Sequence, residues 1–390
     1  MKKKIFITTQ YMHLGGVERS LLGFLDAINY NNYEVDVFIH NHTGELMKYI
    51  NPSANLLNEI HAYTTLTRPI FEILKEGYFK VAFGRLKAKL KAKNLDEDPL
   101  SYSIFQYIAD TTVKYMPQIS NKEYDLAISF LTPHNIVKDK VNAKKKVAWI
   151  HTDYSTISID AKAELPIWSS FDYIAAISES SKGAFDKLFP SLQKKVLVIE
   201  NMLSMQFVKE QAMEETITLG GQVTLLTVGR FSHAKAFDRA VYMCAHLIKM
   251  GVPLKWYAIG YGDQETIEKA IEDTGMQKHF IILGKKTNPY PYMKACNIYV
   301  QPSRYEGKAV TVREAQMLSK PVAITNFPTS QSQLTDGFDG IIVPMDIKGA
   351  TEAIKKLIED EKLQEKLVEN CSRTDYGNFE EIEKVYNCLS

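Results

Sequence analysis

The hydrophobic positions of the chain fall into short continuous runs, and segments with helical spacing separate these runs. Apolar, β-rich runs occupy residues 4–9, 33–39, 124–130, 146–151, 173–178 and 196–200, and then residues 223–228, 254–259, 280–283, 298–301 and 321–325. Helical spacing covers residues 17–30, 236–250, 264–274 and 310–319, and most of 348–390. Continuous apolar strands that alternate with helices are typical of parallel sheets covered on both faces. The pattern predicts an α/β protein with two such sheets in tandem.

The two series of strands are separated by residues 205–222. This stretch is polar, contains three glutamates and ends in Gly220-Gly221. We interpret it as the interdomain linker together with the entry to the second domain. Ligands of open parallel sheets bind at the carboxyl ends of the strands, so we expect the ligand in a cleft between the two sheets.

One segment does not follow the alternation. Residues 68–93 hold eight basic and two acidic side chains, a net charge of 8 − 2 = +6. Apolar residues recur in it at helical spacing, namely Phe71, Leu74, Tyr78, Ala82, Leu86 and Leu90. Two interpretations remain open: a basic amphipathic helix that lies on an anionic membrane, or a helical excursion (about 67–118) packed on the first domain with its lysines in water. The string Asp96-Glu97-Asp98 that follows has the DxD shape of metal–nucleotide sites, but Pro99 after it favours a solvated turn.

Composition narrows the class of protein. The 390 residues are 45% apolar and 24% charged, which is globular and too long for one ordinary core. The net charge of +1 gives no reason to expect a nucleic-acid partner. Four cysteines without a CxxC pair (Cys244, Cys296, Cys371 and Cys388) suit buried, reduced thiols. No run of 18 apolar residues occurs, so we expect a cytoplasmic protein, whose contact with the inner membrane surface is left open.

The richest stretch for chemistry is residues 301–325, which has the order strand, glycine loop, helix. Free N–H groups at the helix start near Val310 attract a phosphate, and Gly307 lets the backbone approach a ligand. Glu306 precedes that position, where it can accept hydrogen bonds from sugar hydroxyls. Glu314, eight residues on, can bind a ribose diol. The plain alternative is a loop carboxylate and a first-turn glutamate favoured by the helix dipole.

Two cations follow the first strand of the second domain. Arg230 leaves the carboxyl end of that strand, and Lys235 stands near the start of the next helix. Together they can neutralise a diphosphate leaving group without a metal. The alternative is a pair of solvated surface cations, which is the usual state of single Arg and Lys residues.

The first domain offers a histidine and a glycine loop. His151 ends a strand in the string WIHTD, where it can bond a sugar hydroxyl or position an acceptor; a strand-end histidine without such a role is equally common. Gly15 and Gly16 form a tight loop at a helix start, without the GxGxxG fingerprint of dinucleotide sites.

These four pieces together resemble family 4 of the retaining glycosyltransferases, which have the GT-B fold of two Rossmann-like parallel-sheet domains facing each other across a cleft. Glu306 and Glu314 match the E-x7-E signature of the family. Arg230 and Lys235 match the residues that hold the donor phosphates, and His151 matches the histidine near the transferred sugar. The resemblance covers most of the chain and is weakest at about residues 52–120.

The resemblance also implies a domain division and further contacts. Gly15 and Gly16 would lie under the diphosphate and acceptor, and backbone near Gly260 and Gly284 would contact the base. A last helix at 376–390 would return to the first domain, which gives an acceptor domain at 1–204 and a nucleotide-sugar domain at 205–375. The chain departs from the family at Ala236, where a glycine is frequent, and at Lys308-Ala309, where the family often has Phe-Gly.

The implied activity is transfer, with retention, of a sugar from a nucleotide-diphosphate donor to a hydroxyl of a glycan or lipid-linked glycan. UDP- or GDP-sugars are the favoured donors, and capsule, lipopolysaccharide or exopolysaccharide synthesis is the implied pathway. No cofactor and no metal are expected. Two alternatives stay open, a sugar-nucleotide epimerase on the same fold and a non-catalytic module that binds a nucleotide sugar or a membrane. The E-x7-E block with Arg230 and Lys235 favours transfer.

Overall fold

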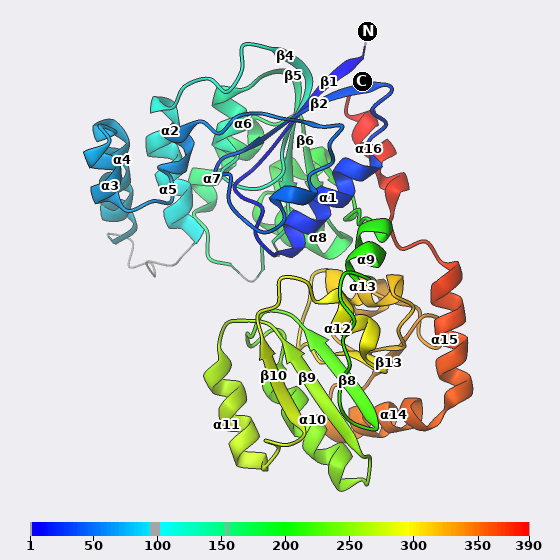
Figure 1. Ribbon diagram of the computed structural model, residues 1–390. Helices are drawn as coiled ribbons and strands as arrows, with labels where there is room; N and C mark the ends of the chain where they lie inside the picture. Colours follow the sequence, from blue (N-terminus) through cyan, green and yellow to red (C-terminus); the bar gives the residue numbers. More distant parts are fainter. Residues whose placement is uncertain (1, 94–101, 153, 156, 390) are drawn as a thin grey trace. The chain divides into compact units, whose positions relative to one another are not determined.

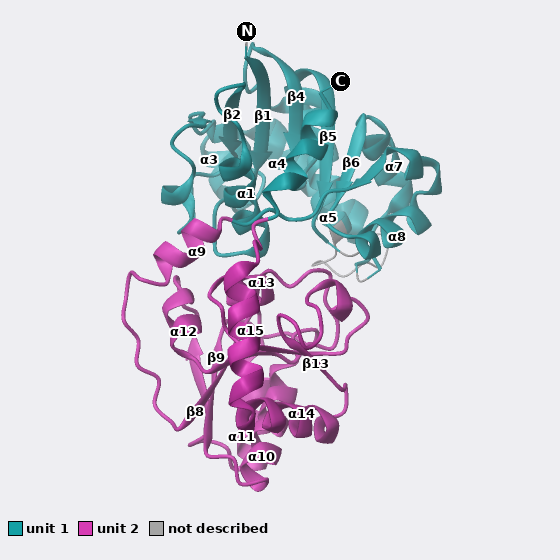
Figure 2. Cartoon of the chain, turned by 90° about the vertical axis from the view of Figure 1, so that its right-hand side faces the viewer, with its two compact units in different colours: residues 1–203, 378–390 teal, residues 204–377 magenta. Residues whose placement is uncertain are grey.

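The computed structural model describes residues 2–93, 102–152, 154–155 and 157–389 (Figure 1). The chain forms two compact units, and each has its own parallel sheet. Unit 1 comprises Met1–Leu203 and Asn378–Ser390, and unit 2 comprises Ser204–Gly377 (Figure 2). The predicted divisions were at 204/205 and 375/376.

The sheet of unit 1 has seven parallel strands in the order β3-β2-β1-β4-β5-β6-β7. These strands are β1 (Lys3–Thr9), β2 (Tyr33–Ile39), β3 (Asn55–Leu56), β4 (Glu123–Ser129), β5 (Asn142–Ile150), β6 (Tyr173–Ala176) and β7 (Val196–Val198). The helices are α1 (Gly16–Ala27), α2 (His61–Thr64), α3 (Ile70–Lys75), α4 (Phe79–Lys93), α5 (Tyr102–Thr112), α6 (Asn135–Lys140), α7 (Ala161–Ser169), α8 (Glu179–Leu188) and α16 (Ile382–Asn387). The central strands are buried on both faces, as continuous apolar runs predict.

The sheet of unit 2 has six parallel strands in the order β10-β9-β8-β11-β12-β13. These are β8 (Val223–Val228), β9 (Leu254–Ile259), β10 (Phe280–Gly284), β11 (Ile298–Gln301), β12 (Val322–Thr325) and β13 (Ile341–Val343). The helices are α9 (Met205–Gln211), α10 (Phe237–Lys249), α11 (Gln264–Thr274), α12 (Tyr290–Ala295), α13 (Val310–Met317), α14 (Ile347–Glu359) and α15 (Glu361–Arg373). The fold class of two Rossmann-like parallel-sheet domains is therefore confirmed.

Two local predictions need correction, and a third concerns residues that the structure does not describe. The first third of the predicted linker is a helix, α9, which packs against α12 and α13 of unit 2. The basic segment is not one helix, because the chain turns at Gly77, whose φ of 85° only glycine adopts without strain, and α3 and α4 flank that turn. Its predicted apolar face is also divided, since Ala82 is buried while Phe71, Leu74, Leu86 and Leu90 are exposed. The string Asp96-Glu97-Asp98 lies outside the described residues.

The C-terminal segment packs within unit 1. The Tyr386 ring of α16 stacks on Tyr33 with 4.3 Å between ring centroids, and its hydroxyl accepts a hydrogen bond from the Asn29 N–H at 2.9 Å. The Glu381 carboxylate accepts one from the Glu200 N–H at 2.8 Å. These contacts join the two ends of the sequence.

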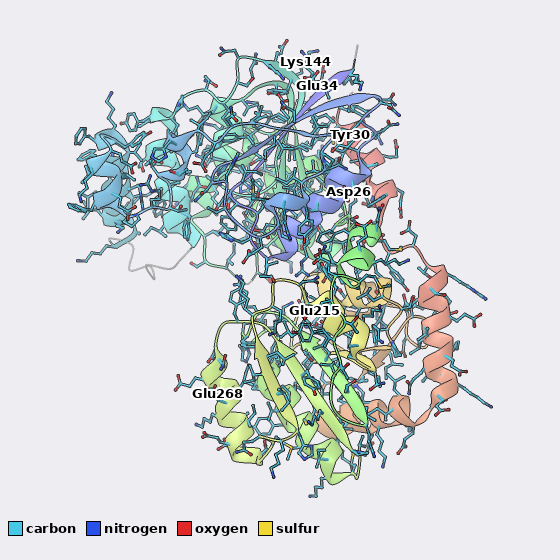
Figure 3. The ribbon with its side chains drawn as sticks, viewed as in Figure 1. Asp26, Tyr30, Glu34, Lys144, Glu215 and Glu268 are labelled. Atoms are coloured by element: carbon cyan, nitrogen blue, oxygen red, sulfur yellow. The ribbon has the colours of Figure 1, made fainter. Side chains whose placement is uncertain are left out.

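The two ends of the strands in the first sheet carry different kinds of residue. The amino ends of its strands carry ion pairs, such as Lys122 Nζ–Asp36 Oδ2 at 2.9 Å and Lys144 Nζ–Asp125 Oδ1 at 2.8 Å; Glu34 and Lys144 are labelled at this edge in Figure 3. The predicted site residues Gly15 and His151 follow the carboxyl ends. Among the described residues, no helix combines the length and apolar character needed to cross a bilayer.

Candidate active site

The site in unit 2 is centred on an ion pair between two residues of the predicted set. Lys235 Nζ lies 2.5 Å from both carboxylate oxygens of Glu306. The Glu306 side chain is 6% exposed and that of Lys235 is 24% exposed. The loops that carry them follow β8 and β11, which are neighbouring strands of the sheet. The structure thus brings together two residues that lie 71 positions apart in the chain.

A second ion pair holds these two loops against each other. Both guanidinium NH groups of Arg304 contact the Asp238 carboxylate, at 3.0 and 2.7 Å. The Arg304 N–H also donates to the Ala234 carbonyl at 2.8 Å, and Nη1 donates to the His233 carbonyl at 2.9 Å. A bidentate pair of this kind fixes position as well as charge. Its effect is to keep the Lys235 loop beside the Glu306 loop.

The Glu306 carboxylate is oriented by hydrogen bonds from residues at and just after the carboxyl end of β11. Ser303 donates from its hydroxyl to Oε1 at 2.7 Å, and the Gln301 amide donates to the same oxygen at 3.2 Å. The side-chain amide oxygen of Gln301, Oε1, in turn accepts a hydrogen bond from the Tyr299 hydroxyl at 2.7 Å. Burial raises the pKa of Tyr299, so that this hydroxyl remains a donor at neutral pH. Glu306 is therefore preset in one orientation by a buried chain of hydrogen bonds.

The start of α13 is braced by residues from beyond β12. The Gln333 side chain accepts from the Ala309 N–H at 2.8 Å and donates to the Gly307 carbonyl at 3.2 Å. The Thr329 hydroxyl donates to the Glu306 carbonyl at 2.8 Å. No atom lies within 4 Å of the position where a Gly307 side chain would begin, so the loop is open on that side. Val310 opens the helix and Lys308 is half-buried in the loop.

Glu314, which the sequence predicts to bind a ribose diol, is deeply buried in unit 2. The residue is 1% exposed, and its Oε1 accepts a hydrogen bond from the Tyr290 hydroxyl at 2.8 Å. Tyr290, the first residue of α12, is itself buried. The aromatic hydroxyl thus orients a carboxylate at the fifth residue of α13. Glu314 lies beyond the first turn of this helix, so the alternative of a first-turn glutamate favoured by the helix dipole is wrong.

Arg230 is placed differently from Lys235. It follows β8 and is exposed, and within the described part of the chain no ion pair is recorded for it. Of the two predicted cations, Lys235 therefore contacts Glu306, and no contact between Arg230 and Glu306 is recorded among the described residues. The departure at Ala236 has a structural reading: the residue adopts φ 55°, ψ 44°, the left-handed region where glycine is unstrained. The frequent glycine of the resembling family fits that conformation.

Gly260 and Gly284 lie at the carboxyl ends of β9 and β10, joined by a hydrogen bond from the Gly260 N–H to the Gly284 carbonyl at 3.0 Å. A Cβ on Gly260 would stand 1.9 Å from the Gly229 carbonyl oxygen and 2.7 Å from the Phe231 ring. Packing of the Arg230 loop therefore requires glycine at 260. Gly284, with φ 70° and open space around it, remains free to face a ligand.

His151 of unit 1 is the next predicted residue. Its ring lies beside Phe130, with 4.7 Å between ring centroids, and burial lowers its pKa to about 3. The imidazole is therefore neutral at neutral pH. Among the described residues, its buried Nε2 has no hydrogen-bond partner. An unsatisfied nitrogen at the end of β5 is suited to a ligand hydroxyl, because a buried polar atom without a partner is costly.

Gly15 and Gly16 open α1, with Gly15 as the residue before the helix. A Cβ on Gly15 would stand 2.1 Å from Oε2 of Glu18, a buried carboxylate whose pKa is raised by desolvation. Glycine at 15 thus leaves room for the Glu18 carboxylate, which would have to move if residue 15 had a side chain. The pattern did not single out Glu18.

Sequence reasoning missed the residues that support the site. Arg304, Asp238, Tyr290, Thr329 and Gln333 act on loops distant in the chain, and no spacing rule indicates them. No cluster of three or more His, Cys, Asp or Glu side chains that could hold a metal occurs among the described residues.

Comparison with known proteins shows what the chain is similar to. Residues 208–374, almost all of unit 2, match the family model Glycosyl transferases group 1. N-acetylgalactosamine-N,N'-diacetylbacillosaminyl-diphospho-undecaprenol 4-alpha-N-acetylgalactosaminyltransferase of Campylobacter jejuni is 24% identical over 99% of this chain and 98% of that protein. Capsular polysaccharide biosynthesis glycosyltransferase CapM of Staphylococcus aureus is 28% identical, over 41% of this chain and 44% of CapM.

Solved structures share the fold over the whole length. TarM superposes with a TM-score of 0.69 at 14% identity, over 100% of this chain and 99% of its own. Anabaena HepE in complex with UDP and glucose gives 0.66 at 15% identity, over 99% of both chains. The chain therefore has the GT-B fold, and residues 208–374 of its unit 2 are similar to group 1 glycosyl transferases.

Proposed function

We propose that the protein transfers a sugar, with retention of the anomeric configuration, from a UDP- or GDP-sugar to a hydroxyl of a lipid-linked glycan. The acceptor would be used at the inner face of the cytoplasmic membrane, in the assembly of a cell-surface polysaccharide. The observation that carries the proposal is the Lys235–Glu306 pair at the carboxyl ends of β8 and β11, within the domain matched to group 1. The relatives support the acceptor class, since the names of three of them specify diphospho-undecaprenol substrates.

The pair suggests how unit 2 receives the donor. A diphosphate is the stronger anionic partner for Lys235 Nζ, and it would draw the lysine away from Glu306. The Glu306 carboxylate, still held by Ser303 and Gln301, would then accept hydrogen bonds from the sugar hydroxyls. Lys235 would then pair with the diphosphate, and the Glu306 carboxylate would be stabilised by hydrogen bonds from Ser303, Gln301 and the sugar hydroxyls.

The chemical step would be a same-face substitution at the anomeric carbon. The bond from that carbon to the phosphate oxygen breaks, the bond to the acceptor oxygen forms on the same face, and the departing phosphate takes the acceptor proton. Negative charge develops on the phosphate, where Lys235, Arg230 and the N–H groups at the start of α13 would stabilise it. With these cations in place, we propose that the transfer needs no metal.

Two further residues complete the proposal. Glu314, held by Tyr290, would bind the ribose of the nucleotide. His151, neutral because its pKa is lowered by burial, would use Nε2 to hydrogen-bond a sugar hydroxyl as unit 1 binds its glycan. Base contacts would come from backbone near Gly284, which stands in open space at the end of β10.

The test is nucleotide release from a panel of UDP-, GDP-, ADP- and dTDP-sugars, with and without undecaprenyl-diphosphate glycans. We expect release from one donor, with its loss in Glu306→Gln and in Lys235→Ala. The matched controls are Glu268→Gln and Lys269→Ala on α11, where both residues are exposed. Glu268 is labelled in Figure 3. Equal activity in site and control variants would refute the assignment. Release of an inverted product would refute retention alone.

A further inference from the structure

Helix α4 presents its large apolar side chains to solvent. Phe79, Phe83, Leu86 and Leu90 are 66, 69, 50 and 56% exposed. Their spacings of four, three and four residues place them in one stripe along the helix. Four large apolar residues in a continuous exposed stripe are unusual on a soluble surface, where they mark an interaction site.

The opposite face of α4 is the one packed on the protein. It consists mainly of small residues, including Gly84, Ala88 and Ala92, and these are buried against α5. The Thr111 hydroxyl of α5 donates to the Gly84 carbonyl at 2.9 Å, and a Cβ on Gly84 would lie 2.9 Å from the Thr111 carbonyl oxygen. The helix is therefore firmly seated, and its exposed stripe is not a core face left unfilled. In Figure 1, α3 and α4 lie at the outer edge of unit 1, with α5 between α4 and the sheet.

Lysines flank the stripe on both sides. Lys80, Lys87 and Lys91 follow one flank, and Lys89 and Lys93 follow the other. Within the part of the chain that the structure describes, only Lys91 of these five has a recorded partner, in Asp160 at 3.8 Å and the Tyr107 ring at 3.7 Å. The two acidic residues of the segment, Glu72 and Glu76, pair instead with Arg68.

Helix α3 extends the same chemistry. Phe71 is 67% exposed, and the Lys75 ammonium lies 4.4 Å from the centre of its ring. Arg85, the remaining cation, is turned inward and donates to the Thr65 and Arg68 carbonyls. The exposed charged residues on α4 itself are thus all lysines.

We propose that this surface, defined by Phe79, Phe83, Leu86 and Leu90 with the flanking lysines, lies on an anionic lipid bilayer. The apolar stripe would enter the headgroup–acyl boundary while the lysine ammonium groups reach the lipid phosphates. A second copy of the chain is a poor occupant, because it would set lysines against lysines. The inference deepens the proposed function, on which it rests for the lipid-linked acceptor, by naming the surface that brings the enzyme to it.

The test is flotation of the full chain with vesicles of equal parts phosphatidylglycerol and phosphatidylcholine, and with pure phosphatidylcholine vesicles. We expect binding to the anionic vesicles at low salt, and its loss at about 1 M salt, where the screening length is about 3 Å. Phe79→Ser/Phe83→Ser should weaken binding about tenfold or more. Lys80→Gln/Lys87→Gln/Lys89→Gln should weaken it roughly 100-fold.

Matched controls remove equivalent groups from unit 2. Met213 and Phe338 are exposed there, and Met213→Ser/Phe338→Ser should float like the wild type. The triple change Lys348→Gln/Lys362→Gln/Lys366→Gln tests charge alone, at exposed positions of α14 and α15. All variants alter exposed side chains, so their thermal transitions should match that of the wild type.

Three results would overturn the proposal. One is the absence of wild-type binding to anionic vesicles at low salt, and another is equal binding by surface and control variants. The third is a wild-type dimer that Phe79→Ser/Phe83→Ser converts to monomer, which would make the surface an interface between copies. Nucleotide release is measured on the same preparations: vesicle binding without release would refute the proposed transfer and leave the membrane surface standing, and release without vesicle binding would do the reverse.

Discussion

Tyr290 gives the clearest quantitative test of how unit 2 is built. Its hydroxyl donates to Glu314 at 2.8 Å, and both residues are buried. Tyr290→Phe removes one oxygen and keeps the ring, so little packing is lost. A buried hydrogen bond to a carboxylate contributes about 1.5–3 kcal/mol. Since 1 kcal/mol shifts the midpoint of a domain of this size by about 2–4 °C, the thermal transition of unit 2 should fall by roughly 3–12 °C.

The same substitution should weaken nucleotide binding about tenfold, because a carboxylate that is no longer oriented must be ordered by the ligand. Calorimetric scans and nucleotide titrations would compare Tyr290→Phe with Tyr242→Phe, a half-exposed tyrosine of α10 in the same unit. In a Glu314→Gln background the loss from Tyr290→Phe should shrink, because the pair acts as one unit. A Tyr290→Phe protein with a wild-type transition, or the same loss in both backgrounds, would refute the reasoning.

Three further predictions concern the buried histidines and Glu164 of unit 1, and Gly260 of unit 2. Burial lowers the pKa of His40, His134 and His151 to about 3, so the unfolded chain binds more protons below about pH 6.5; urea denaturation should show stability falling from there as the pH drops. Burial raises the pKa of Glu164 to about 7, so the stability that its protonated form contributes to the fold is complete below about pH 4.5 and is lost as the pH rises through 7. At about pH 8, Glu164→Gln should therefore be more stable than the wild type by up to about 3 kcal/mol. A less stable Glu164→Gln protein at that pH would contradict this prediction. Gly260→Ala should destabilise unit 2 by about 3 kcal/mol or more, because its Cβ would meet the Gly229 carbonyl; a wild-type melting curve would show that the loop can yield.

The sequence predicted the sheets well because continuous apolar runs leave few alternatives. Residues 223–228, 254–259 and 298–301 are strands with the predicted ends. Two short edge strands, Asn55–Leu56 and Ile341–Val343, were not predicted. Their extended conformation depends on pairing with a neighbouring strand rather than on a long apolar run. The helix at Met205–Gln211 escaped too, because its polar surface conceals the few residues that pack on unit 2.

Sequence reasoning named the candidate site residues, but it could not predict how their side chains meet. Strand ends and a helix start indicated Lys235, Glu306 and Glu314, yet their direct partners depend on contacts between distant loops. The bond from Tyr290 to Glu314 spans 24 positions, and the contact of Arg304 with Asp238 spans 66. Single-sequence periodicity reports burial within one element, and it carries no information about which loops meet.

The Lys235–Glu306 pair is the centre of the account, and calorimetric titration of the released nucleotide tests it most directly. If the diphosphate takes Lys235 from Glu306, Lys235→Ala should weaken nucleotide binding by about 10- to 100-fold, the value of a charged contact. Glu306→Gln should bind the nucleotide at least as tightly as the wild type, because it removes the competing carboxylate, while sugar transfer is lost. Equal weakening in both variants, or full transfer activity in Glu306→Gln, would contradict the account.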